Sequence, residues 1–220
     1  ARSDDGRRAL ERIEGLPGQR QVIDGPYVDV PTAAWVDRDM GDELTRQRER
    51  GTSVLNEHMG RADSSVWDGR SGVTPATLAA LWPVGVRTTV LAPETLDGVD
   101  TTTGPVSVDA GGGRSVDAVV VDRGLTTAVG WRDDPVLDAA TVAAELALIA
   151  AAADEDATAA VVLAPPDDWP TDPAAVSALA RVLADPVAPA EAVTIDGLLE
   201  RTPGGPTAAL APLVLPDLGA

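Results

Sequence analysis

The sequence predicts an α/β fold with a mainly parallel sheet. Short runs of consecutive apolar residues, which suit strands covered on both faces, alternate along the chain with segments of helical periodicity. The clearest run is "AAVVLAPP", which starts at Ala159. Several helical segments begin with a polar residue followed by proline, a pattern that marks a helix start. We expect about six parallel-type strands, fewer than the eight of a complete (β/α)₈ barrel.

The expected strands lie in the apolar runs Gln21–Ile23, Ser65–Trp67, Thr88–Leu91, Ala118–Val121, Ala160–Leu163 and Ala192–Ile195. A further stretch, "GPVSVDAGGGRSVDAVVVD", has two alternating runs on either side of Gly111, Gly112 and Gly113. It predicts a β-hairpin inserted into the α/β pattern. A phosphate-binding loop is the alternative for these glycines, but the chain has no Lys and a strand, not a helix, follows.

Helices are predicted by apolar periodicity and by capping residues. The first helix carries an apolar stripe within residues 9–13, and "MGDELTRQRERG" predicts a solvated helix that ends at Gly51. Thr74 before Pro75 opens a short helix that stops near Pro83.

Two longer helices are expected in the second half of the chain. "DAATVAAELALIAAAA" has Asp138 as its available cap, and "TDPAAVSALARVLADP" places Asp172 before Pro173. The apolar run Ala139–Ala153 contains Glu145 and spans only about four turns of helix, so we expect a packed helix and no membrane span.

These elements predict one barrel-like domain over residues 1–202. Because the chain opens on a helix, we expect the first strands of the barrel to lie upstream of residue 1. Residues 203–220 carry four prolines and no helical period, and they predict a linker or a strand that leads to another domain.

Composition excludes several classes of function. The net charge is -18 and the pI is about 4.2, so nucleic acids and anionic membranes are disfavoured as partners. The chain has no Lys and no Cys, and His58 is its one imidazole. Schiff-base chemistry, thiol nucleophiles and zinc sites with two or more His are therefore excluded, and we expect no cofactor and no metal. Carboxylates remain as the reactive groups.

Candidate site residues lie where the predicted strands end, because ligands of parallel α/β folds bind at that end of the sheet. Asp24 and Asp68 end successive strands and are the candidate catalytic pair, since glycoside hydrolysis needs two carboxylates. Acids and aromatic rings suit sugar binding, and the candidate substrate-binding residues are Tyr27, Asp29, Trp67, Glu94, Asp122, Arg123, Asp167 and Trp169. The alternative is structural: Asp forms turns and caps helices, Trp packs in cores, and Arg123 pairs with a neighbouring acid.

Four stretches carry a family resemblance: "GPYVDVP", "SSVWDGRSGVTPATLAAL", "AAELALIAAAADEDATAAVVLAPPDDWPTDPAAVSALARVL" and "AVTIDGLLE". They resemble a family of large, uncharacterised cell-envelope proteins of high-GC Gram-positive bacteria whose genes neighbour that of the lipid II flippase MurJ. The resemblance covers roughly Ile23 to Glu200. It implies an incomplete (β/α) barrel of glycoside hydrolase or polysaccharide deacetylase type, in an exported, membrane-tethered parent protein without established activity.

Two functions fit these observations. The first is a non-catalytic module on the extracellular face of the cell envelope that binds peptidoglycan-type glycan or an envelope protein in cell-wall assembly. The alternative is a carbohydrate-active enzyme, a glycoside hydrolase that uses two carboxylates. The sequence favours the first, because it contains no strong motif of paired carboxylates. A deacetylase is disfavoured, since its Asp-His-His metal set needs a second His.

Overall fold

The computed structural model describes residues 20–98, 104–129, 134–153, 159–165, 173–185, 188, 190–202 and 204–213. By its internal contacts the chain divides into two compact units. Unit 1 comprises Ala1–Asp97, Ser107–Ala118 and Thr207–Ala220, and unit 2 comprises Gly98–Val106 and Val119–Pro206.

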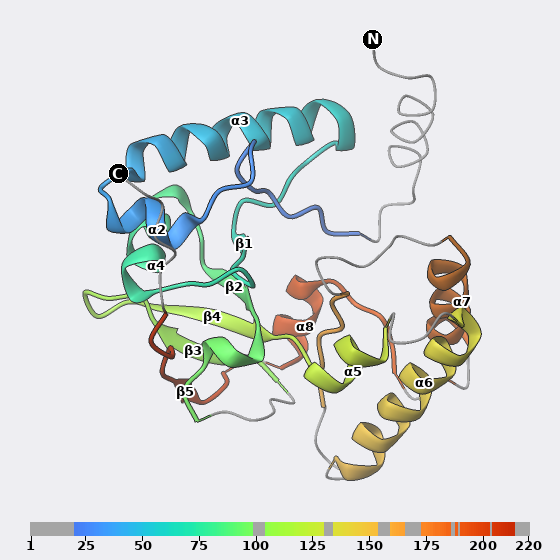
Figure 1. The fold of residues 1–220 in the computed structure, drawn as a ribbon. Helices are drawn as coiled ribbons and strands as arrows, with labels where there is room; N and C mark the ends of the chain where they lie inside the picture. Colours follow the sequence, from blue (N-terminus) through green and yellow to red (C-terminus); the bar gives the residue numbers. More distant parts are fainter. Residues whose placement is uncertain are drawn as a thin grey trace. The chain divides into compact units, whose positions relative to one another are not determined.

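Within the described residues, five strands form one sheet (Figure 1). The strands are β1 (Val66–Asp68), β2 (Thr88–Leu91), β3 (Val106–Asp109), β4 (Ser115–Val120) and β5 (Thr207–Ala208), in the order β1-β2-β4-β3-β5. β1 pairs with β2 in parallel, and β3 pairs with β5 in parallel. The prediction of an α/β fold with a mainly parallel sheet is confirmed.

The predicted hairpin is formed by β3 and β4, which are neighbours in the sheet. The amide of Ala110 donates to the carbonyl oxygen of Arg114 at 2.9 Å and closes the turn. The three glycines of this turn have φ of 77°, 63° and 73°. Only glycine adopts such values without strain at successive positions, so the "GGG" run is explained by turn geometry.

Three expected strands are shorter than predicted or missing. Residues 21–23 and 160–163 each contribute one parallel bridge, Ile23 with Asp63 and Val162 with Val121. The prediction of a strand at Ala192–Ile195 is wrong. Thr194 instead caps helix α8 (Ile195–Arg201) by accepting from the Gly197 amide at 3.1 Å. Side-chain capping of the backbone outweighs the short apolar run here.

In unit 1, α2 (Thr32–Asp37) packs on α3 (Gly41–Met59) and on α4 (Pro75–Leu81). Thr74 and Pro75 begin α4 as predicted, and Thr74 forms a reciprocal capping box with Thr77. Two 3₁₀ turns, η1 (Trp82–Val84) and η2 (Pro93–Thr95), flank β2 in sequence.

The prediction that the second helix ends at Gly51 is wrong, because α3 continues to Met59. Gly51 is buried, and a Cβ atom there would lie 2.0 Å from the carbonyl oxygen of Gly25. The glycine lets the loop after Ile23 cross the helix at close range. It serves packing between two segments and does not terminate the helix.

Unit 2 contains α5 (Arg123–Ala128), α6 (Pro135–Ala152), α7 (Pro173–Ala184) and α8. α6 packs on α5 and α7, and its stripe of Val142 and Leu146 joins a core with Leu125 and Val129. The first helix predicted at residues 9–13 and the predicted cap Asp172 lie outside the described residues.

α6 differs from its prediction at its start. Its cap is Asp134, which accepts from the amides of Val136 and Leu137, whereas the predicted cap Asp138 lies inside the helix and is buried. In the described part of the chain, α6 is the helix whose length and composition would allow it to cross a membrane, with 22% of it buried. Its buried residues pack against protein in unit 2.

Candidate functional site

Asp24, a predicted catalytic residue, forms a buried ion pair with Arg48 of α3. The Asp24 Oδ1 accepts from Arg48 Nε at 3.2 Å and lies 3.2 Å from Nη2, and the two side chains are 1% and 4% exposed. Its Oδ2 accepts from the Thr52 hydroxyl at 2.8 Å. Both carboxylate oxygens are therefore engaged, as a buried charge requires.

The Arg48 guanidinium also locates Asp24 relative to the sheet. It donates to the carbonyl oxygen of Val84 at 2.9 Å and to that of Ser64. Ser64 precedes β1 and Val84 precedes β2 in the chain. Ile23, next to Asp24, forms a parallel bridge with Asp63, which also precedes β1. Asp24 thus lies at the amino end of β1.

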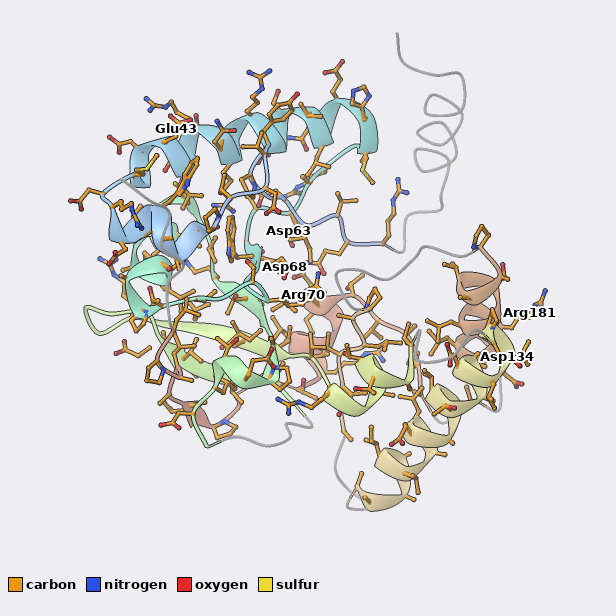
Figure 2. All side chains as sticks on the ribbon, viewed as in Figure 1. Glu43, Asp63, Asp68, Arg70, Asp134 and Arg181 are labelled. Atoms are coloured by element: carbon orange, nitrogen blue, oxygen red, sulfur yellow. The ribbon has the colours of Figure 1, made fainter. Side chains whose placement is uncertain are left out.

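Asp68, the other predicted catalytic residue, lies at the opposite end of the same strand. It is the last residue of β1, and its carboxylate binds Arg70, with Nη2 to Oδ2 at 2.8 Å and Nε to Oδ1 at 3.0 Å. Figure 2 shows Asp63 before β1, and Asp68 with Arg70 beyond it. The backbones of Asp24 and Asp68 are separated by on the order of 10 Å along the strand. The structure does not bring the predicted catalytic pair together.

The aromatic candidates differ in exposure. Trp67 is 3% exposed in β1, with the Arg48 guanidinium 5.8 Å from its ring centroid, so its ring packs inside unit 1 and presents no open face to a sugar. Tyr27 is 48% exposed, and the Arg50 guanidinium lies 4.4 Å from its ring. Asp29 is exposed in the same loop.

The remaining candidates fall in different parts of the chain. Glu94 is exposed in η2, in unit 1. In unit 2, Asp122 caps α5 by accepting from the Leu125 amide at 2.8 Å, and Arg123 is the exposed first residue of that helix. This is the structural alternative foreseen for Asp122. Asp167 and Trp169 lie outside the described residues.

Three described carboxyl groups have a shifted pKa, and all three are shifted downward. Burial opposes ionisation of Asp63, but hydrogen bonds from Ser65 and Gln21 outweigh it and lower the pKa. Hydrogen bonds from Gln47 and Arg46 lower the pKa of Glu43, and Arg201 lowers that of Glu191. These groups are ionised at neutral pH, which is the opposite of what a general acid needs.

A groove of about 560 Å³ lies along α3 at the amino end of β1 and β2, and most of its lining residues are polar or charged. We call it the α3 groove. Asp24 and Arg48 form its floor, and its other lining residues are Thr45, Glu49, Thr52, Ser53, Asn56, Ser64 and Val84. Hydroxyl, amide and carboxylate groups can exchange hydrogen bonds with a polar ligand there.

The α3 groove was not predicted from the sequence. A signal for it exists, because Thr45, Glu49, Thr52 and Asn56 repeat at helical spacing and place polar groups on one face. The run "RQRERG" resembles an ordinary solvated face, and the burial of Arg48 within it depends on Asp24 from a distant segment. Among the described residues, no group of three or more His, Cys, Asp or Glu is placed to hold a metal ion.

Comparison with known protein families found no match, and no curated protein sequence matches the chain. A solved structure is similar in fold: a 4-alpha-glucanotransferase from Thermococcus litoralis, with a TM-score of 0.68 and 15% sequence identity. The similarity covers 94% of this chain and 33% of that one, so this chain spans about a third of the enzyme's length. The α/β fold is therefore one that also occurs in a glucan-processing enzyme.

Proposed function

We propose that this chain is a non-catalytic, glycan-binding module with an incomplete glycosidase-like (β/α) barrel. The main evidence for the proposal is the position of the two candidate carboxylates and the partners that they bind. Asp24 and Asp68 lie at opposite ends of β1, and each is already bound by an arginine. Two groups placed in this way do not flank one glycosidic bond, which hydrolysis requires.

Glycan is the favoured ligand for two reasons. The fold is similar to that of a protein named for transferring glucan, and the α3 groove is lined by groups that bond to hydroxyls. The negative charge of the chain disfavours nucleic acids. The resemblance to the cell-envelope family adds the remaining part of the proposal: an exported, membrane-tethered parent protein that acts on the extracellular face in cell-wall assembly.

The proposal is tested by combining a binding assay with a product assay. The chain is titrated by calorimetry with neutral oligosaccharides and with peptidoglycan fragments, and each mixture is then analysed for products by chromatography. We expect saturable binding of a glycan and no new product. The absence of saturable binding for every oligosaccharide and peptidoglycan fragment would exclude the glycan role.

A glycoside hydrolase is the second candidate, and the enzymatic activity named for the similar structure favours it. It predicts turnover that is lost in Asp68→Asn, because that carboxylate is 47% exposed and accessible to substrate. The matched control is Asp97→Asn, an exposed acid elsewhere in unit 1. Turnover that is lost in Asp68→Asn and retained in the control would overturn the non-catalytic proposal.

A further inference from the structure

We infer that the α3 groove is the glycan site of this chain and that it selects neutral, hydroxyl-rich oligosaccharides over acidic ones. This inference rests on the proposed function, because it names the site and the ligand class of the same activity. The α3 groove lies at the amino ends of β1 and β2, whereas the sequence predicts a site at the carboxyl ends of the strands.

The dimensions of the groove suit a chain of sugar units. Its volume of about 560 Å³ lies within the range of roughly 300–1,000 Å³ that is usual for small-molecule sites. Thr45 and Asn56, the lining residues of α3 that are furthest apart, are separated by about 16 Å along the helix axis. This length exceeds that of a single ring, so several linked rings can lie along α3.

The polar groups of the groove offer both donors and acceptors. The Thr45 hydroxyl donates its hydrogen to the Gly41 carbonyl oxygen at 3.0 Å. The lone pairs of the Thr45 oxygen can therefore accept a hydrogen bond from a ligand. The Asn56 Oδ1 accepts from the Ala62 amide at 2.7 Å, which leaves the Asn56 nitrogen as a donor. Ser53 is exposed and can do either. Sugar hydroxyls also donate and accept, so they match this lining better than a purely apolar or purely cationic ligand does.

The charges of the groove favour an uncharged ligand. Arg48 is neutralised by Asp24, and both side chains are buried beneath the groove. Glu49 is exposed at its edge, so the charge that faces a ligand is negative, in a chain whose net charge is already -18. An acidic sugar would therefore be repelled. Val84 is the one apolar residue among the described residues that line the groove, and the carbon atoms of the polar side chains supply the rest of its apolar surface. Without an aromatic ring among these residues to cover a sugar face, we expect weak binding.

The ligand class is tested on the full chain with three probes: maltohexaose and chitohexaose, which are neutral, and hexagalacturonate, which is acidic. We expect saturable binding of at least one neutral probe, with a Kd that is unchanged between about 0.05 and about 0.5 M NaCl because no net charge is exchanged. We expect hexagalacturonate to bind at least about tenfold more weakly. Glu49→Gln should strengthen binding of hexagalacturonate several-fold relative to binding of the neutral probe, because it removes the exposed negative charge. Equal or tighter binding of the acidic probe would overturn the selectivity.

The position of the site is tested by variants of α3. Ser53→Leu places an apolar side chain in the groove and should weaken binding of the neutral probe at least about tenfold. Thr45→Val keeps the shape of the side chain, removes the hydroxyl and should weaken binding about two- to fivefold. Arg50→Leu is the matched control, because Arg50 stacks on Tyr27 and does not line the groove. Thermal unfolding reports whether each variant is folded.

The outcomes separate this inference from the proposed function. If the neutral probe binds the wild-type chain and both Ser53→Leu and Thr45→Val bind it equally well, the glycan site lies elsewhere and only the inference fails. If no oligosaccharide binds the wild-type chain, the proposed function itself fails. If Ser53→Leu does not fold, Thr45→Val against Arg50→Leu decides the position of the site.

Discussion

Among individual residues, Arg48 connects several segments of unit 1 that are distant in sequence. It forms an ion pair with Asp24 in the loop after Ile23, and it donates to the carbonyl oxygens of residues that precede β1 and β2. Its guanidinium also lies over the ring of Trp67. An arginine suits this position because its planar guanidinium has five donors and can satisfy several acceptors at once. Neither partner can be lost without leaving a buried charge.

The first prediction concerns this pair. Arg48→Met and Asp24→Asn should each lower the free energy of unfolding by about 3–5 kcal/mol, because each leaves the other group buried without its counter-charge. The double variant should lose less than the sum of the two single losses. Chemical denaturation gives the values.

The exposed pair Arg201–Glu191 is the control for this prediction. Its side chains are 52% and 71% exposed, so Arg201→Met should not change stability measurably. A fully stable Asp24→Asn variant that no longer binds glycan would show instead that Asp24 acts on the ligand.

The second prediction concerns the pH dependence of stability at Asp63. The pKa of this carboxyl is lower in the folded chain than its ordinary value of 3.8, so ionisation favours folding. The contribution is present in full above about pH 5 and is lost as the pH falls through the folded pKa. Asp63→Asn should therefore be less stable than the wild-type chain at neutral pH, and the difference should shrink as the pH falls below about 4. Urea denaturation across this range measures it, with Asp29→Asn in an exposed loop as the control.

At the scale of elements, α3 shows what local sequence signals can and cannot predict. The capping signal of α4 is sufficient to predict where the helix begins, because Thr74, Pro75 and Thr77 interact within one turn. The prediction that Gly51 ends the helix is wrong because a lone glycine has the same local signature whether it terminates a helix or allows another segment to cross it. The deciding contact is with Gly25, which lies in another part of the chain.

The third prediction uses this contact. Replacement of a helical glycine by alanine usually stabilises a helix by about 1 kcal/mol, but Gly51→Ala should destabilise the chain by about 1–3 kcal/mol because the new Cβ meets the Gly25 carbonyl. Gly41→Ala, at the first position of the same helix, is the matched control. No atom lies within 4 Å of its Cβ position, so it should be neutral or mildly stabilising. Thermal unfolding of both variants compares them, and a stabilised Gly51→Ala would contradict the close crossing.

Charge acts at the scale of the whole molecule. With 35 acidic and 17 basic residues, the chain carries a net charge of -18, and the folded state concentrates this charge. Mutual repulsion of like charges lowers the stability of a compact state, and salt screens it.

The fourth prediction follows from this charge. The free energy of unfolding should rise as NaCl increases from about 0.02 to about 0.3 M, because the Debye length shortens and repulsion in the folded chain weakens more than in the unfolded chain. Urea denaturation at several salt concentrations measures the effect, and NaCl against KCl at equal ionic strength shows whether screening is its cause. A stability that falls with salt would show that attractive ion pairs dominate instead.

The fold class was predictable from the sequence, whereas the candidate site was predicted only in part. β2 occupies Thr88–Leu91 as predicted, since three β-branched residues followed by leucine suit a strand buried on both faces. The predicted strand at Ala192–Ile195 is a loop that leads into α8, because the Thr194 cap and the burial of Leu198 outweigh a short apolar run. Asp24 and Asp68 were identified as acids next to strands, but which end of β1 each occupies depends on the pairing of Ile23 with Asp63.

The sequence by itself determined the α/β alternation, the strong negative charge, and the chemistry that is impossible without Lys, Cys or a second His, because these properties follow from residue types and local order. Only the tertiary structure decided that Asp24 is buried against Arg48, that it lies at the other end of β1 from Asp68, and that α3 carries a polar groove. The physical reason is that these features arise from contacts between residues 16 or more positions apart, and local periodicity does not specify such contacts.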